Sequence, residues 1–379
     1  MRNPFIYGEE AAGEAFCDRE DERKELLRDI RNGVNVIIFS PRRYGKTSLI
    51  KEVLKKLDKK QTVAVYVDLY PAVTKQKFLD QYAMAISRAL TGKLEARLKT
   101  LRELFPRLLP KLVIKGEAGT PEFEFDYDAS KRPSLYLDEM LQAVKKYADR
   151  HGRDAVVVFD EIQEILQYED DEIEKAMRAA FQSHRNVSYI FLGSKRHLME
   201  KMFNDPNRPF YKSGKHLPLK RIPENELRPF ILKKFREGKF KIAAPEADQI
   251  IALTECHPYY AQFLCHVLWD NCTDKQEITA ADILQAVNGV IDRERSLFLT
   301  IWDGLTRQQK ALLLALAKSA ESKQTQIFSH HFLAAHYLGA ASSAQKSLAR
   351  LIEKNIIDRE NGAYVFADVF FKRWLEKLA

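Results

Sequence analysis

One stretch limits the possible folds of this chain more than any other: residues 34–50, with the sequence VNVIIFSPRRYGKTSLI. The run of apolar residues Val34, Val36, Ile37, Ile38 and Phe39 is typical of a buried strand. A polar loop follows, and an apolar helical pattern begins at Ser48. Strand, tight loop and helix in this order predict a phosphate-binding loop, because the loop and the first helical turn direct backbone N–H groups at one position.

Individual residues of the loop fit contact with a polyphosphate. Gly45 allows the backbone to approach phosphate because it has no Cβ. We expect Lys46 to hold the β- and γ-phosphate oxygens and the Thr47 hydroxyl to contact Mg²⁺. The other predicted nucleotide-binding residues of the loop are Ser40, Pro41, Arg42, Arg43, Tyr44 and Ser48. Ser40 departs from the common pattern G-x-x-x-x-G-K-[ST], which has glycine there.

A second motif follows at a suitable distance, in residues 155–165, AVVVFDEIQEI. Its apolar run is typical of a fully buried parallel strand, and Asp160 and Glu161 end it. Ligands bind outside the carboxyl ends of such strands. Asp160 is therefore predicted to hold Mg²⁺ through its water shell, and Glu161 to orient and activate a water molecule. The alternative is an acidic pair that merely ends a strand and starts a helix.

Length and composition set broad limits. A chain of 379 residues suggests two or three domains, and no apolar run is long enough to cross a membrane. The N-terminus lacks an apolar signal core, so we expect a cytoplasmic protein without membrane contact. The net charge of +8 permits nucleic-acid binding without establishing it. Four cysteines lack metal-ligand spacing and are interpreted as reduced, mostly buried thiols: Cys17, Cys256, Cys265 and Cys272.

The motifs occur in a recognisable order. F-x-[GD]-R-x-x-E at residue 16 precedes P-R-R-x-G-K-T-S-L, the apolar strand with Asp-Glu, and Gly-Ser at 193–194. In this order the chain resembles the predicted Walker-type ATPases of archaea and bacteria, a branch of the AAA+/STAND P-loop group. PFYKSGKHLPL, HPYYAQFL and NGAYVFADVFFKRWL extend the similarity over essentially the whole chain.

The resemblance implies a fold and a domain order. The expected class is α/β: an AAA+-like P-loop NTPase parallel sheet with five core strands, followed by a helical lid and a winged helix. We place the ATPase core at residues 1–222, the lid at 223–296 and the winged helix at 297–379. Beyond the two motifs, the expected core strands are 62–69, 187–192 and 216–219, with an inserted hairpin at 112–117 and 122–127. The last lid helix is expected at 279–287.

The resemblance also assigns residues outside the two motifs. Phe16 and Arg19 could form the adenine-side wall, or simply belong to a helix that packs ahead of the first strand. His257 and Pro258 are implied to close over the adenine and ribose, with an ordinary helix start as the alternative. Ser194 is the candidate sensor between the acidic motif and the γ-phosphate; a strand-end turn is its alternative.

Basic residues near residue 210 raise the question of an arginine finger. Arg208, Lys212 and Lys215 are the candidates for acting on the γ-phosphate in a neighbouring subunit. Relatives of this sequence often have Arg where Lys212 stands, and Lys lacks the bidentate fork of Arg. We therefore expect no essential finger.

The C-terminal winged helix leaves its partner open. Its third helix, residues 342–353, would enter the major groove if the domain reads double-stranded DNA. It offers few base-reading groups: Ser342, Ser343, Gln345, Lys346 and Arg350, with Arg359 on the wing. Basic and acidic residues are mixed across the domain, so a protein-binding wing fits the sequence equally well.

The sequence therefore predicts an ATPase whose cofactors are ATP and Mg²⁺. It would act as a nucleotide-dependent switch with slow hydrolysis, as a monomer or a nucleotide-dependent oligomer, and transmit its ATP or ADP state through the winged helix. Two alternatives stay open: a signalling or defence ATPase with a protein-binding wing, and a nucleotide-binding module with vestigial hydrolysis.

Overall fold

The computed structural model describes residues 2–8, 13, 17, 19–115, 120–126, 134–319, 327–360 and 362–378. Its contacts divide the chain into two compact units. The first contains Met1–Asp18, Pro41–Gly45 and Arg221–Ala379, and the second contains Arg19–Ser40 and Lys46–Lys220. The predicted domain boundaries stay predictions.

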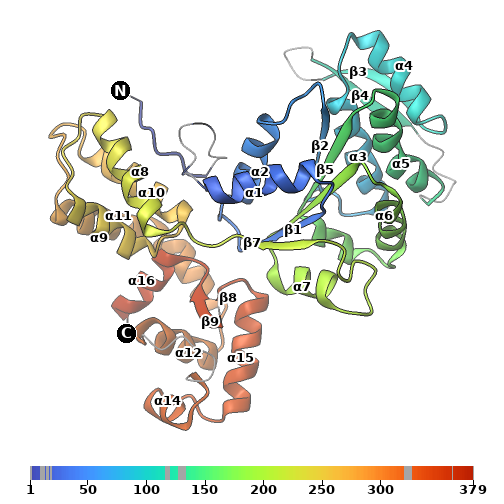
Figure 1. The fold of residues 1–379 in the computed structure, drawn as a ribbon. Coiled ribbons are helices and arrows are strands. Elements are labelled where there is room, and N and C mark those ends of the chain that lie inside the picture. The colour runs from blue at the N-terminus through green and yellow to red at the C-terminus, as the bar shows by residue number, and fades with distance from the viewer. Residues whose placement is uncertain are drawn as a thin grey trace. The chain divides into compact units, whose positions relative to one another are not determined.

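A five-stranded parallel sheet organises the second unit (Figure 1). The strand order is β2-β5-β6-β1-β7. The strands are β1 (Val36–Phe39), β2 (Thr62–Asp68), β5 (Asp154–Asp160), β6 (Val187–Gly193) and β7 (Lys215–Pro218). Parallel pairing places their carboxyl ends at one edge of the sheet. The predicted α/β class with five core strands is confirmed.

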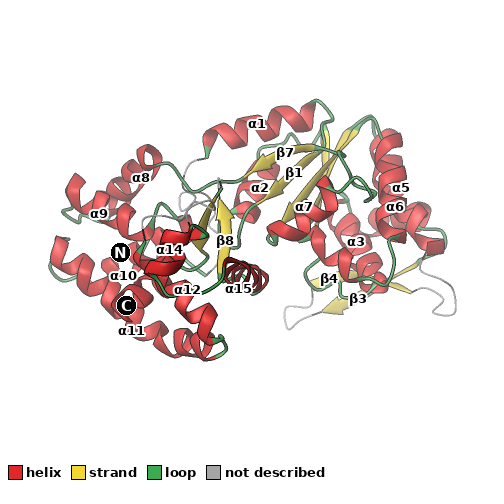
Figure 2. Ribbon diagram, turned by 90° about the horizontal axis from the view of Figure 1, so that it is seen from below, coloured by secondary structure: helices red, strands yellow, loops and turns green. Residues whose placement is uncertain are grey.

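Helices cover both faces of this sheet, which explains why β1, β5 and β6 are apolar almost throughout. Ile37 and Phe39 of β1 point into a core that they share with α3 (Lys75–Ala89), α5 (Ser134–Arg150) and α6 (Glu172–Ser183). Successive strand residues point to opposite faces, so Val36 and Ile38 are buried on the other side. Figure 2 shows α1 (Glu20–Arg31) on one side of the strands and α3 on the other.

Smaller elements complete the second unit. Helix α4 (Leu94–Leu104) precedes an antiparallel hairpin, β3 (Leu109–Lys115) and β4 (Thr120–Asp126). The hairpin begins earlier in the chain than the pattern predicted. A 3₁₀ segment, η2 (Ile162–Gln167), follows β5, and α7 (Arg196–Asn204) follows β6. Neither was expected from the sequence, although Met199, Met202 and Phe203 of α7 are buried at helical spacing.

The first unit contains the helices α8 (Glu224–Glu237), α9 (Ala244–Thr254), α10 (Pro258–Asn271) and α11 (Ala280–Asp303). A helical segment was expected here, but α11 is much longer than the predicted helix at 279–287. Its apolar period continues through the buried Val290, Ile291 and Phe298, so no sequence signal ends it at Val287. The helix therefore runs across the boundary predicted between residues 296 and 297.

The chain ends in the expected winged-helix order. Helices α12 (Arg307–Lys318), α14 (His330–Ala335) and α15 (Ala341–Glu353) precede the wing strands β8 (Ile357–Glu360) and β9 (Ala363–Phe366), and α16 (Val369–Leu378) follows. Gly362 has φ +79°, a conformation that suits the tight turn between the two strands. Phe298 and Trp374 pack together, with ring centroids 5.9 Å apart, which joins α11 to α16.

No helix in the described part of the chain is both long and apolar enough to span a bilayer. None of the four cysteines, which all lie in the described ranges, forms a disulfide; Cys17, Cys265 and Cys272 are buried and Cys256 is partly exposed.

Candidate nucleotide-binding site

The predicted phosphate-binding loop leaves the carboxyl end of β1 and leads into α2 (Lys46–Lys55). Lys46 is the first residue of this helix and is 6% exposed. Its Nζ donates a hydrogen bond to the backbone oxygen of Ser40, 2.8 Å away. Gly45 has φ +82°, and a Cβ built on it would have no heavy atom within 4 Å. The space above Gly45 is therefore open to a ligand, at a helix N-terminus that favours anions.

The tip of the loop, residues 41–45, belongs to the first unit. Arg43 has φ +67°, and its guanidinium carbon lies 4.3 Å from the ring centroid of Tyr259. Tyr44 is buried and donates its hydroxyl hydrogen to Glu360. Burial raises the pKa of Tyr44, so the phenol stays protonated and acts as a donor.

The two motifs meet in the second unit through one hydrogen bond. The Thr47 hydroxyl donates to Oδ2 of Asp160 at 2.8 Å, across 113 positions of sequence. Asp160 is 5% exposed, and burial raises its pKa while hydrogen bonds from Tyr66 and Thr47 oppose that shift. The two residues predicted to hold Mg²⁺ are thus brought together.

Tyr66, which the sequence analysis missed, contacts the same carboxylate. Its hydroxyl also donates to Oδ2 of Asp160. Burial, with the nearby Asp160 charge, raises the pKa of Tyr66 and keeps its proton in place. A signal was available, because Tyr66 stands two residues before Asp68, at the carboxyl end of β2. Recognising it required the knowledge that β2 lies beside β5.

Glu161 adopts φ +52°, an uncommon conformation for a residue with a side chain. Such backbone conformations concentrate at functional sites. Oε2 of Glu161 accepts hydrogen bonds from Ser194 Oγ at 2.7 Å and from Gln163 Nε2 at 2.5 Å. The predicted sensor Ser194 therefore lies beside the predicted water-activating residue. Gln163 was not anticipated.

Gly193 explains how these side chains approach so closely. A Cβ at this position would lie 2.2 Å from Met199 Sδ and 2.7 Å from Gln163 Oε1. A larger residue at the end of β6 would therefore require the buried side chains of Met199 and Gln163 to shift.

Two of the three finger candidates form ion pairs within the second unit. Arg208 pairs with Glu174, which is 2% exposed, and burial raises the pKa of that carboxyl. Lys215 Nζ lies 2.6 Å from Glu25 and 2.7 Å from Asp29. The third, Lys212, lies with its Nζ 5.2 Å from the ring centroid of Tyr211. The expectation of no essential finger stays a prediction.

Of the residues predicted to lie on the adenine side, the structure describes all except Phe16. Arg19 is buried, and its Nη2 donates to the backbone oxygen of Lys220 at 2.7 Å, while its Nη1 lies 3.0 Å from Glu22. Phe16 lies outside the described residues. In the first unit, His257 is buried as the N-cap of α10, with Pro258 in the first helical turn. That position suits the fixed φ of proline.

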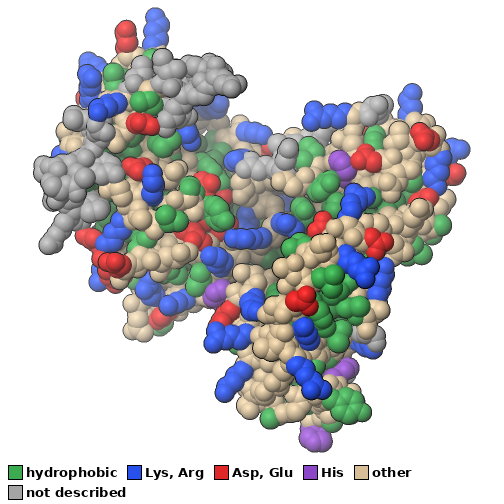
Figure 3. Space-filling view, turned by 180° about the vertical axis from the view of Figure 1, so that it is seen from behind, with side chains coloured by type: hydrophobic (Ala, Val, Ile, Leu, Met, Phe, Trp, Pro, Cys, Tyr) green, Lys and Arg blue, Asp and Glu red, His purple; other side chains and the backbone are tan. Residues whose placement is uncertain are grey.

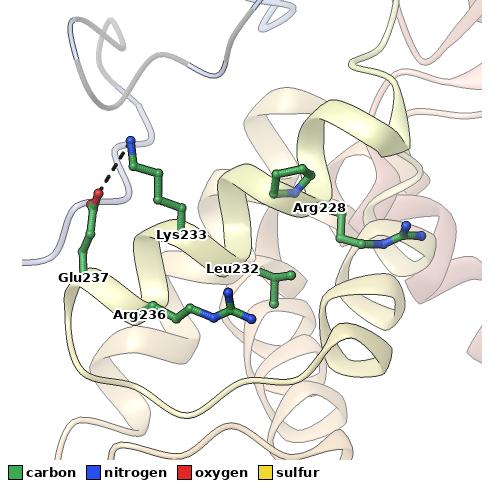
Figure 4. Close-up of a pocket in the computed structure, with 6 residues that line it drawn as sticks. Arg228, Leu232, Lys233, Arg236 and Glu237 are labelled. Carbon is green, nitrogen blue, oxygen red and sulfur yellow. Dashed lines mark ion pairs between the residues drawn. The ribbon is translucent and has the colours of Figure 1, made fainter.

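A surface hollow of about 580 Å³ lies elsewhere, along α8 of the first unit (Figure 4). Its lining residues all come from that one helix: Arg228, Pro229, Leu232, Lys233, Arg236 and Glu237. It has none of the loop or strand-end features of a nucleotide site, so it is not the candidate site.

The residues present fit a nucleotide-bound Mg²⁺ better than a protein-only metal cage. Within the described ranges, no group of three or more His, Cys, Asp or Glu side chains is placed to hold a metal ion. Mg²⁺ is usually bound by one or two carboxylates together with phosphates and water. Asp160 supplies one carboxylate and Thr47 one hydroxyl oxygen, beside an open helix N-terminus.

Comparison with protein families decides the classification. The model of a family described as "ATPase domain predominantly from Archaea" matches residues 16–262. This chain belongs to that family. A second model, described as a probable winged helix domain, matches residues 296–377 of this chain. No curated protein sequence matches it.

Solved structures of this fold include Walker-type ATPases. The Walker-type ATPase PABY2304 of Pyrococcus abyssi is 18% identical; the alignment covers 98% of this chain and 99% of that one, with a TM-score of 0.67. The ORC2 protein of Aeropyrum pernix, in ADPNP and ADP complexes, is 13% identical over 100% and 96% of the chains, with a TM-score of 0.57. The ORC1 protein of the same organism, in complex with DNA, is 13% identical over 96% and 94%, with a TM-score of 0.50. At these identities the likeness shows the fold, a Walker-type ATPase followed by a winged helix.

Proposed function

We propose that this archaeal-type ATPase binds Mg-ATP and hydrolyses it slowly, and that it acts as a nucleotide-dependent switch on a partner of its winged helix. The observation that supports this most strongly is the hydrogen bond between Thr47 and Asp160. It joins the phosphate-loop helix to the acidic strand end beside an open helix N-terminus. That combination is what binding of a magnesium triphosphate requires.

Each residue of the site would have a separate task. The Lys46 ammonium would neutralise charge on the β- and γ-phosphates, as the phosphate-loop lysine does in this class. Thr47 and Asp160 would hold Mg²⁺, whose positive charge stabilises negative charge that develops on the transferred phosphoryl group. Glu161 would orient and activate the attacking water, and Ser194 would respond to the nucleotide state.

Slow hydrolysis is supported by the contacts of Glu161. Its Oε2 already accepts hydrogen bonds from Ser194 and Gln163. A carboxylate oxygen has about two acceptor sites, so the attacking water could bind this oxygen only after one of the two donors leaves it. Rearrangement of these bonds would therefore set the rate at which water is activated. Glu161 would then be the side chain through which a partner could change that rate.

Double-stranded DNA is the partner that we test first. Ser342, Gln345, Lys346 and Arg350 are exposed on α15, the helix expected to enter the groove. Arg350 also pairs with Glu353 at 2.7 Å. Basic and acidic side chains are interspersed over the face of the molecule in Figure 3, so strong phosphate binding over a wide area is not expected. Modest, salt-sensitive affinity is the corresponding prediction.

The test measures ATP turnover with and without duplex DNA, and DNA affinity at several salt concentrations. The mass of the protein in solution is also measured, in ADP and in a non-hydrolysable ATP analogue, to detect a nucleotide-dependent oligomer. Lys346→Ala together with Arg350→Ala should weaken DNA binding and reduce the salt dependence by about one unit of slope for each lost phosphate contact. Lys233→Ala, an exposed lysine on α8, is the matched control. Turnover supports the ATPase, and nucleotide-dependent DNA affinity supports the switch on DNA.

Two other outcomes would contradict parts of this proposal. ATP turnover without DNA binding, but with nucleotide-dependent co-purification of a protein, would favour the protein-binding wing. Tight nucleotide retention without turnover would contradict the ATPase and favour a vestigial site.

A further inference from the structure

The side chain of Tyr66 connects β2 to the candidate metal site. Tyr66 pairs in register with Val158 of β5, and two residues later Asp68 pairs with Asp160. The phenol donates its hydroxyl hydrogen to Oδ2 of Asp160. Lys51 of α2 lies with its Nζ 5.2 Å from the centroid of the Tyr66 ring. The ring is partly exposed, and its hydroxyl is hydrogen-bonded to the acid.

Three donors determine the orientation of the Asp160 carboxylate. Oδ1 accepts from the backbone N–H of Glu161 at 2.9 Å. Oδ2 accepts from Thr47 at 2.8 Å and from Tyr66. An ionised carboxylate has no hydrogen to give, so both hydroxyls donate to it. The Thr47 oxygen thereby keeps its lone pairs available for a metal ion.

We propose that Tyr66 is a positioning residue of the magnesium site, whose hydroxyl fixes the Asp160 carboxylate in the orientation that receives Mg²⁺. This inference rests on the proposed function, because it concerns the same site. Groups that hydrogen-bond a metal-ligating carboxylate orient it, and removing one costs about 10–100-fold in metal affinity or activity. Tyr66 would act on the metal through Asp160 and not on the phosphates, which are the task of Lys46.

Tyr82 provides a matched comparison for the role of one hydroxyl. Tyr82 lies on α3, fully buried against Phe159, with ring centroids 5.3 Å apart. Its hydroxyl is buried without a hydrogen-bond partner among the described residues. Tyr66→Phe and Tyr82→Phe each delete one phenol oxygen and keep the ring. Only the first deletion removes a hydrogen bond to Asp160.

The test measures ATP affinity by calorimetry with and without Mg²⁺, in the wild type and both variants. We expect Tyr66→Phe to leave the affinity for metal-free ATP unchanged and to shift the midpoint of a Mg²⁺ titration to about 10–100-fold higher concentration. Tyr82→Phe should match the wild type in both measurements. A loss of general packing would instead lower the thermal midpoint and weaken metal-free ATP binding as well.

A double-mutant cycle separates positioning from an independent effect. In an Asp160→Asn background, Tyr66→Phe should cause little further loss of the Mg²⁺ response, because the hydroxyl acts through Asp160. Additive losses would overturn the inference, and so would an unchanged Mg²⁺ response in Tyr66→Phe, while the proposed function would survive both results. A wild type that binds no ATP would overturn the proposed function and this inference together.

Discussion

The replacement Glu161→Gln tests the chemistry of the site with the smallest change in shape. Gln keeps the length of the side chain and leaves the backbone at φ +52° unaltered. Only the negative charge and the ability to take a proton are lost. Ser194 and Gln163 still have one amide oxygen to which they can donate.

The structure allows the expected magnitudes to be compared. Hydrogen bonds to a charged group contribute about 1 kcal/mol more than neutral ones, so weakening two of them costs about 2 kcal/mol of unfolding free energy at most. Removing a general base lowers the rate by about 10²–10⁴-fold. That corresponds to about 3–5 kcal/mol on the activation barrier. Turnover should therefore fall far more than stability.

The assay is phosphate release in a single turnover at saturating Mg-ATP, with ATP affinity measured on the same samples. We expect ATP affinity to be retained and phosphate release to be lost. Glu164→Gln is the matched control, since Glu164 is the neighbouring carboxylate on η2 and pairs with Lys195 at 3.0 Å. Unchanged phosphate release in Glu161→Gln, or an equal loss in Glu164→Gln, would refute the role assigned to Glu161.

Two further predictions concern packing in the second unit. Gly193→Ala places a Cβ 2.2 Å from Met199 Sδ and should lower the unfolding free energy by about 1–3 kcal/mol, measured by denaturant unfolding. Gly289→Ala, where a Cβ meets nothing within 4 Å in α11, should not destabilise the protein, and an equal loss in both variants would contradict this reasoning. Burial lowers the pKa of His184 from 6.5 to about 4, and the ring accepts or donates hydrogen bonds with Tyr189 and Gln142. Between those pH values the unfolded chain binds more protons, so the unfolding free energy should fall as the pH is lowered from 6.5 towards 4. His184→Gln should flatten that dependence, and a wild-type curve that is already flat there would show that His184 does not titrate as inferred.

The elements of the candidate nucleotide-binding site could be predicted because each of them is local in sequence. Val36 to Phe39, Gly45 and Lys46 form strand, loop and helix within a few residues, so their order is readable without tertiary structure. Asp160 could be predicted as part of the same site, because the buried apolar run before it indicates a parallel strand, and ligands bind at the carboxyl ends of such strands. The hydrogen bond between Thr47 and Asp160 shows that the structure brings these two motifs together.

The remaining contacts depend on sheet order and side-chain direction, which the sequence does not state. Tyr66 reaches Asp160 because β2 lies directly beside β5, although α3, α4, the β3–β4 hairpin and α5 separate them in sequence. Gln163 reaches Glu161 because a 3₁₀ turn follows β5 and because Gly193 leaves room for it. The length of α11 could have been predicted, because its apolar period continues beyond residue 287. It was missed because the predicted boundary was taken from the resemblance.

The central claim is that the loop before α2 and the acidic end of β5 bind one Mg-ATP together. Calorimetric titration of ATP into the wild type and Lys46→Ala, with Mg²⁺ present, tests it most directly. Lys55→Ala, an exposed lysine at the end of the same helix, is the control. The account predicts ATP binding by the wild type and by Lys55→Ala, and no detectable binding by Lys46→Ala. Equal ATP affinity in all three proteins would contradict it.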